Sequence, residues 1–178
     1  MKEFIPYFIP SISENEINEV SDTLRSGWLT TGNKTKKFEA SFSDFLNNEI
    51  EAMAVSSATA GLHLALAALE IGVGDEVIVP NHTFTATAEV VRYTGAEVKL
   101  VDINVNSLNI DPILIEKSIN SKTKAIIVVH FAGLACEMNE IIKIAKKHKL
   151  FIIEDAAHAL PTTYMKNTIG NLDTDATI

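Results

Sequence analysis

The amino-terminal part of the chain has the spacing of hydrophobic positions that is typical of two amphipathic helices. Ser13 and Glu16 form a capping-box pair ahead of apolar residues that recur at helical spacing as far as Leu24. Gly27 predicts the end of this helix. After a polar loop, aromatic residues repeat at helical spacing and predict a second helix, whose aromatic stripe we expect in the core. The stripe consists of Phe38, Phe42 and Phe45.

From residue 52 onward, short apolar runs alternate with helical stretches, and this pattern predicts strands joined by helices. The predicted strands are Ala52–Val55, Glu76–Val79, Glu97–Val101, Ala125–Val129 and Leu150–Ile153. The predicted helices between them include residues 62–69, 141–145 and 111–119, the last with a proline just inside its start. Strands that are apolar on both faces indicate a doubly wound α/β fold, with helices on both faces of a mostly parallel sheet in three α/β/α layers.

Composition narrows the class of protein. The 178 residues are 47% hydrophobic and 21% charged, which fits one soluble globular domain. The net charge of −8 argues against a nucleic-acid partner. Cys136 has no second cysteine to pair with, no signal peptide is recognisable, and no apolar run approaches the roughly 20 residues of a membrane helix, so we expect a cytoplasmic protein without a membrane partner. A sixth apolar run opens at 175–178 without a cap or turn to finish it, which favours a truncated sequence.

Polar residues follow the predicted strands, and in doubly wound sheets ligands bind beyond the carboxyl ends of the strands. The small residues Ser56–Thr59 follow one strand and open a helix, where exposed N–H groups and the helix dipole attract phosphate. A plain helix cap formed by Ser57 or Thr59 is the alternative. Neither a Walker loop nor a Gly-x-Gly-x-x-Gly motif occurs, which argues against nucleotide hydrolysis and standard dinucleotide binding.

Two further residues near strand ends favour a planar, cationic ligand. Asp155 ends an apolar run, where a carboxylate needs a cation or backbone donors, and the protonated pyridine nitrogen of pyridoxal phosphate is one such cation. A capping or turn aspartate is the alternative. Phe84 lies between two threonines near another strand end, and its ring either stacks on a planar cofactor or packs in the core.

The histidines suggest a different chemistry. His82, His130 and His158 each follow a predicted strand and, together with Asp155, form a candidate zinc site for a hydrolase. No closely spaced pair of metal ligands supports this hypothesis, so we rank it below a phosphate-anchored cofactor. His63 and His148 lie on predicted helices and are interpreted as ordinary surface or core residues.

Five ordered segments resemble the DegT/DnrJ/StrS family of sugar aminotransferases, which use pyridoxal phosphate and adopt the aspartate-aminotransferase-like fold, fold type I. The segments are Gly27–Gly32, Ala54–His63, Gly74–Ile78, Lys122–Ile127 and Ile153–Ala159. Within the family, the Ser-Ser-Ala-Thr-Ala-Gly and Glu-Asp-Ala-Ala-His-Ala segments are most similar to those of UDP-4-amino-4-deoxy-L-arabinose–oxoglutarate aminotransferases. The resemblance extends along nearly the whole chain.

This resemblance implies roles for individual residues. Two residues would bind the cofactor phosphate, and one each would stack on the pyridine ring, pair with its nitrogen and approach its hydroxyl; in that order they are Ala58, Thr59, Phe84, Asp155 and His158. A loop beside the sugar-nucleotide site would contribute Trp28, Thr30 and Thr31.

The resemblance also implies how the chain is organised. Residues 1–33 would form an amino-terminal helix and substrate loop, and residues 34–178 would form the α/β sheet region of the large cofactor-binding domain. The family's Schiff-base lysine follows a Phe-Ser-Phe stretch that would lie beyond Ile178, as would the small carboxy-terminal domain. We therefore expect no catalytic residue within this chain.

As a function, the resemblance implies transfer of an amino group from glutamate, released as 2-oxoglutarate, to a 4-keto nucleotide sugar by a homodimer. The first candidate substrate is a UDP-4-keto-pentose in lipid A or other cell-surface sugar synthesis. The 178-residue chain alone is expected to be inactive. Two alternatives stay open, which are an inactive binding or regulatory module with the same fold and the zinc hydrolase described above.

Overall fold

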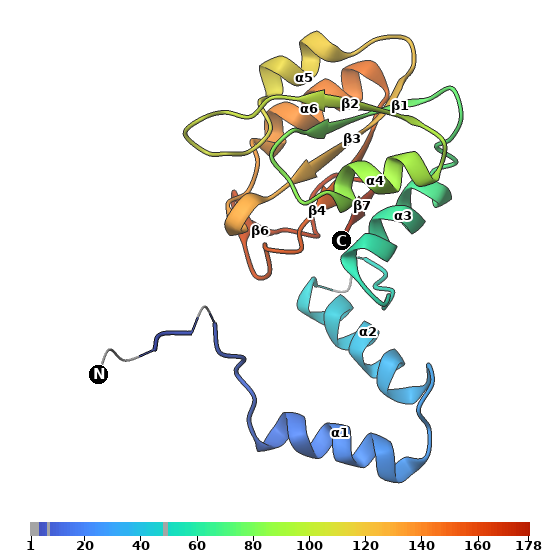
Figure 1. Ribbon diagram of the computed structural model, residues 1–178, viewed down its shortest axis with the longest axis vertical. Coiled ribbons are helices and arrows are strands. Elements are labelled where there is room, and N and C mark those ends of the chain that lie inside the picture. The colour runs from blue at the N-terminus through green and yellow to red at the C-terminus, as the bar shows by residue number, and fades with distance from the viewer. Residues whose placement is uncertain (1–3, 7, 48–49) are drawn as a thin grey trace.

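The computed structural model describes residues 4–6, 8–47 and 50–178, and its centre is a five-stranded sheet in the order β2-β1-β3-β4-β7 (Figure 1). Every neighbouring pair of these strands is parallel, so their carboxyl ends meet at one edge of the sheet. The strands are β1 (Glu76–Pro80), β2 (Glu97–Val101), β3 (Thr123–Val129), β4 (Phe151–Asp155) and β7 (Ala176–Thr177). A separate antiparallel pair joins β5 (Thr163–Tyr164) to β6 (Asn167–Thr168).

Helices cover both faces of the sheet, which confirms the predicted α/β/α layers (Figure 1). Side chains alternate along β1, so that Val77 packs with Leu66 on one face while Ile78 packs with Ile141 on the other. The first face is covered by α3 (Ala58–Ala68) and α4 (Ala86–Tyr93), and the second by α5 (Pro112–Ser118) and α6 (Met138–His148). A short 3-10 turn, η1 (Phe131–Gly133), connects β3 to α6.

The predicted strand at Ala52–Val55 does not form, although the other predicted strands do. No strand within the described ranges pairs with this segment, and a strand requires backbone hydrogen bonds to a neighbour. The backbone N–H of Ala54 donates instead to Oε1 of Glu39 (2.9 Å). The apolar run at the end of the chain does find a partner, because it pairs with β4 as β7.

The predicted amino-terminal helices form as α1 (Glu14–Ser26) and α2 (Asn33–Phe45). Both halves of the capping box between Ser13 and Glu16 are present, and Gly27 ends α1 with a left-handed φ of 72°. Among the helices of the described ranges, none is both long and apolar enough to cross a membrane.

The expectation that the aromatic stripe of α2 lies in the core is wrong. Phe38 is 59% exposed and Phe45 is 50% exposed. Both rings pack on the intervening Phe42, with centroid distances of 6.0 and 6.4 Å. Figure 1 shows α1 and α2 lying apart from the sheet, so the sheet and its helices do not cover the stripe.

Candidate functional site

Asp155 is the last residue of β4 and lies at the carboxyl edge of the sheet, with 8% of its surface exposed. Its Oδ2 accepts a hydrogen bond from Oγ1 of Thr87 on α4, and its Oδ1 accepts one from the backbone N–H of Ala157, both at 3.3 Å. No ion pair to this carboxylate occurs within residues 4–6, 8–47 and 50–178. A carboxylate has about four acceptor positions, so Asp155 retains the capacity to bind a cationic donor.

Phe84 lies in the turn between β1 and α4 and is 76% exposed, so the core-packing alternative for this ring is wrong. The carbonyl of Phe84 accepts a hydrogen bond from the backbone N–H of Thr87 (3.1 Å). Oγ1 of Thr83, from the same turn, lies 2.8 Å from Oγ1 of Thr87. The turn that presents the exposed ring is therefore tied to the residue that contacts Asp155.

The start of α3 lies at the same edge of the sheet. Ser57 is its N-cap, and its Oγ accepts a hydrogen bond from the backbone N–H of Ala60 (3.1 Å), so the cap predicted as an alternative is present. Ala58 and Thr59 are the first residues of the helix and are partly buried. A cap of this kind uses one of the backbone N–H groups that lack intrahelical partners at a helix start, and the others stay available to an anion.

Ile178 joins the start of α3 to the end of β4. Its backbone N–H donates to the carbonyl of Glu154 (2.8 Å), and its carbonyl accepts from the N–H of Ala156 (2.7 Å). A Cβ added at Gly61 would lie 2.8 Å from Cγ2 of Ile178, so the absence of a side chain permits this close approach. The first turn of α3 and the end of β4 therefore lie on either side of a single residue.

The predicted substrate loop lies elsewhere in the molecule. Trp28, Thr30 and Thr31 are exposed between α1 and α2, and Nε1 of Trp28 donates to the carbonyl of Thr31 (3.1 Å). Because α1 and α2 lie apart from the sheet (Figure 1), the structure does not bring this loop to the edge where Asp155 lies.

The three histidines of the zinc hypothesis are not brought together. The ring of His82 packs on Phe131 with a centroid distance of 4.5 Å. His130 is fully buried, and both of its ring nitrogens form hydrogen bonds inside the protein. His158 is exposed in the loop that follows β4. In the part of the chain that the structure describes, no group of three His, Cys, Asp or Glu residues is arranged to hold a metal ion.

Glu154, one position before the end of β4, forms a fully buried cluster with His130 on the face of the sheet opposite α4. Its Oε2 lies 2.9 Å from Nε2 of His130, and its Oε1 accepts from the hydroxyls of Thr174 (2.7 Å) and Thr177 (2.8 Å). Nδ1 of His130 accepts from the backbone N–H of Cys136 (3.1 Å), so the ring proton resides on Nε2 and points to Glu154. The two threonine hydrogen bonds connect β7 and the segment before it to β4.

Cys136 is buried in the same cluster, and its reactivity follows from that environment. Burial, and next the negative charge of Glu154, raises the pKa of the thiol to about 12. Because the thiolate is the reactive form, we predict that folded protein resists alkylation of Cys136 by iodoacetamide at about pH 8, and that urea-unfolded protein is alkylated. Intact mass spectrometry distinguishes these outcomes, and fast alkylation of the folded chain would contradict the prediction.

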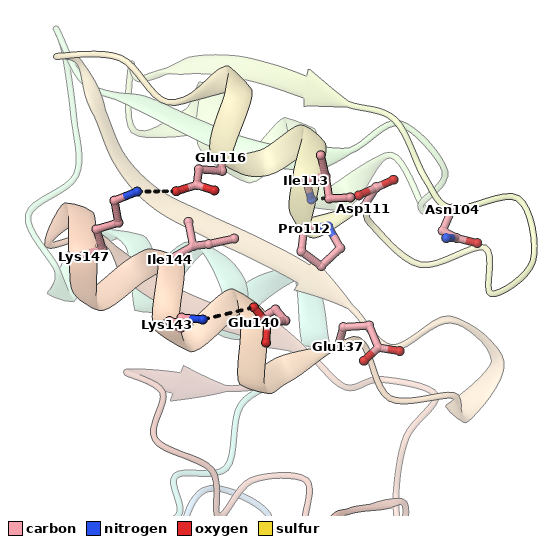
Figure 2. A pocket seen from close by; sticks show the side chains of 10 residues that line it. All are labelled: Asn104, Asp111, Pro112, Ile113, Glu116, Glu137, Glu140, Lys143, Ile144 and Lys147. Carbon is pink, nitrogen blue, oxygen red and sulfur yellow. Dashed lines mark hydrogen bonds and ion pairs between the residues drawn. The ribbon is translucent and has the colours of Figure 1, made fainter.

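A hollow with a volume of about 550 Å³ lies between α5 and α6 (Figure 2). Two ion pairs cross it or lie along its wall, Lys147 with Glu116 at 2.6 Å and Lys143 with Glu140 at 3.8 Å. It is lined by Asn104, Asp111, Pro112, Ile113, Glu116, Glu137, Glu140, Lys143, Ile144 and Lys147. None of the residues predicted to bind cofactor or substrate is among them, so the hollow is separate from the candidate site.

The sequence patterns do not predict two buried contacts at the sheet edge, which are Thr87 with Asp155 and His130 with Glu154. Thr87 lies on an ordinary amphipathic helix, and nothing in its spacing marks it as a partner of Asp155. Glu154 does leave a signal, because a charged residue inside an apolar strand requires a buried partner. The pattern does not say which residue that partner is.

Comparison with known proteins gives one family. The sequence profile of the DegT/DnrJ/EryC1/StrS aminotransferase family matches residues 10–178. The spore coat polysaccharide biosynthesis protein SpsC of Bacillus subtilis (strain 168) is 48% identical over 174 residues, which are 98% of this chain and 44% of SpsC.

Solved structures of similar sequence agree with this result. Spr1654 from Streptococcus pneumoniae, a protein assigned as a sugar aminotransferase and solved in apo, PLP and PMP forms, superimposes in its PMP form with a TM-score of 0.89 and 40% identity, over 93% of this chain and 45% of Spr1654. DesV of S. venezuelae superimposes with a TM-score of 0.84 and 36% identity, over 88% of this chain and 42% of DesV. The chain spans less than half the length of these relatives. It belongs to the DegT/DnrJ/EryC1/StrS aminotransferase family.

Proposed function

We propose that this chain is the cofactor-binding portion of a pyridoxal-phosphate-dependent aminotransferase that moves an amino group from glutamate to a 4-keto nucleotide sugar. The family match and the sugar aminotransferases among the structural relatives support the reaction class, and the PLP and PMP forms of Spr1654 support the cofactor. The observation that carries the proposal is the buried carboxylate of Asp155, which has no cation among the described residues, at the edge where α3 begins.

The chemistry of this edge fits the cofactor. A buried carboxylate is unfavourable unless it is paired, and a protonated pyridine nitrogen supplies both a positive charge and a hydrogen-bond donor. The exposed ring of Phe84 offers a flat apolar surface. The first turn of α3, with Ala58 and Thr59, offers backbone N–H groups to the phosphate. His158, three residues beyond Asp155, would approach the ring hydroxyl.

When bound, the cofactor supplies an electron sink and carries the amino group between the two substrates. Asp155 would keep a proton on the ring nitrogen, because its negative charge favours the protonated form. The start of α3 would anchor the phosphate and so fix the orientation of the ring, while Phe84 would exclude water from one face of the ring. The lysine that shuttles the proton would come from sequence beyond Ile178.

For the sugar, we propose a UDP-4-keto-pentose used in synthesis of a cell-surface polysaccharide or lipid A sugar, in the cytoplasm. The similarity to SpsC, a spore coat polysaccharide biosynthesis protein, supports a cell-surface product. Trp28, Thr30 and Thr31 would contact the sugar nucleotide. A homodimer is proposed as well, because an exposed loop that lies apart from its own sheet edge can serve the site of a second subunit.

The test of this function uses the intact gene product, with whatever sequence follows Ile178. We expect the purified protein to bind pyridoxal phosphate and, with glutamate alone, to release one equivalent of 2-oxoglutarate per bound cofactor as the cofactor absorbance changes. Addition of the UDP-4-keto-pentose should then restore the original spectrum, and the dTDP-linked sugar serves as the comparison. Absence of cofactor binding or of 2-oxoglutarate would overturn the proposal.

The 178-residue chain expressed alone is expected to release no 2-oxoglutarate above a protein-free control. The reason is that the proton-shuttling lysine would lie beyond residue 178, and transamination needs a positioned acid–base group. The measurement is the same glutamate reaction, run beside the intact gene product at equal concentration. Turnover by the short chain at the rate of the intact protein would show that the lysine assignment is wrong.

A further inference from the structure

Thr87 occupies the junction between the two elements that would contact the cofactor ring. Its side chain is fully buried, and its Oγ1 lies 3.3 Å from Oδ2 of Asp155 and 2.8 Å from Oγ1 of Thr83. Its backbone N–H donates to the carbonyl of Phe84 (3.1 Å). One residue of α4 thus contacts both the acid at the end of β4 and the turn that carries the exposed aromatic ring.

The direction of these hydrogen bonds follows from the chemistry of the groups. An ionised carboxylate only accepts hydrogen bonds, so the hydroxyl proton of Thr87 must point to Asp155. The oxygen of Thr87 is then an acceptor for the hydroxyl proton of Thr83. The resulting series of hydrogen bonds runs from Thr83 through Thr87 to Asp155, and each donor orients the oxygen that follows it.

These hydrogen bonds matter because the side chains of Thr87 and Asp155 are buried. Among the residues that the structure describes, only two donate a hydrogen bond to the Asp155 carboxylate, and the other is the 3.3 Å bond from the backbone N–H of Ala157. Loss of the threonine hydroxyl would therefore leave Oδ2 without its donor. A buried carboxylate that loses a donor is destabilised in its charged form, and its side chain is free to rotate. The orientation of the acid and the placement of the Phe84 turn therefore depend on the same hydroxyl.

We propose that Thr87 is a positioning residue that holds the carboxylate of Asp155 and the Phe84 turn in register for one planar cationic ring, with Thr83 supporting it. The inference rests on the proposed function, since it takes the ring to be that of pyridoxal phosphate. Thr87 acts through Asp155 and the turn and does not itself touch the cofactor.

The experiment compares Thr87→Val, which keeps the shape of the side chain and removes the hydroxyl, with the wild-type intact gene product. We expect the dissociation constant for pyridoxal phosphate to rise about tenfold, the value of one hydrogen bond to a charged group. We also expect the induced circular dichroism of the bound cofactor to weaken, because the carboxylate no longer holds the ring in one orientation.

Three further variants separate positioning from folding. Thr87→Ser restores the hydroxyl and should recover most of the affinity and the cofactor spectrum. Thr83→Val keeps the Thr87–Asp155 bond and should change the same quantities in the same direction by a smaller factor. Thr85→Val makes the same chemical change in the same turn, at a side chain that makes no capping hydrogen bond, and should match the wild type.

The outcomes decide between the two proposals. If the wild-type protein binds no pyridoxal phosphate, the proposed function fails and this inference fails with it. If the wild type binds and reacts with glutamate while Thr87→Val lowers only the unfolding temperature and keeps the wild-type affinity and spectrum, the inference alone is overturned. If Thr87→Val does not fold, the wild-type cofactor affinity and spectrum in Thr83→Val would likewise overturn it.

Discussion

Asp155→Asn should slow the reaction of the intact gene product with glutamate by about 10- to 1000-fold, because a neighbouring opposite charge shifts the pKa of its partner by about 1 to 3 units. The asparagine is isosteric but neutral, so it no longer favours a proton on the ring nitrogen, and the cofactor becomes a poorer electron sink. Stopped-flow absorbance of the bound cofactor after mixing with glutamate measures the rate directly.

The matched control for this variant is Asp102→Asn. Asp102 also follows a strand at the carboxyl edge, but it is exposed and accepts hydrogen bonds from the N–H of Ile103 and from Nδ2 of Asn81. These two bonds, the first of them the larger contribution, lower the pKa of Asp102, so its carboxylate is already satisfied without a cofactor. A rate for Asp155→Asn equal to that of the wild type, with cofactor bound, would remove Asp155 from the ring-nitrogen role.

Glu154→Leu should lower the free energy of unfolding by about 3 to 5 kcal/mol, the usual result of removing one member of a buried polar or ionic pair. The substitution removes the common acceptor of the buried ring N–H of His130 and of the partly buried hydroxyls of Thr174 and Thr177. Urea unfolding followed by circular dichroism measures the change. A loss below about 1 kcal/mol would contradict the prediction, since surface changes usually stay within about 0.5 kcal/mol.

Two controls identify the source of this loss. Glu140→Leu makes the same chemical change on an exposed residue of α6, whose ion pair with Lys143 is long, and should leave stability nearly unchanged. The double variant His130→Leu with Glu154→Leu removes both buried partners. It should lose less stability than the two single variants added together, because no buried ring N–H is then left unpaired.

Short sequence patterns correctly predicted the starts of two helices. The capping box at Ser13 and the proline at residue 112 each marked the start of a helix that forms where expected. The same patterns failed for Ala52–Val55 and for the stripe containing Phe38, since an apolar run has the same spacing whether or not another element lies beside it.

Some features of the candidate site were likewise predicted from the sequence, and others were not. The order of residues along the chain placed Asp155 at the tip of an apolar strand and Ser57 at the start of a helix, and the resemblance of whole segments indicated the family. Both inferences use information that lies within a few neighbouring residues. The exposure of Phe84 could not be read in this way, because either fate of an aromatic residue is compatible with its local sequence.

Order along the chain was thus enough for the α/β class, the helix starts and the position of the acid. Tertiary packing alone decided which side chains contact Asp155 and Glu154. Thr87 meets Asp155 across 68 positions of sequence, and His130 meets Glu154 across 24. Periodicity specifies which face of an element is buried, whereas the identity of the side chain opposite depends on how helices and strands from distant parts of the chain pack together.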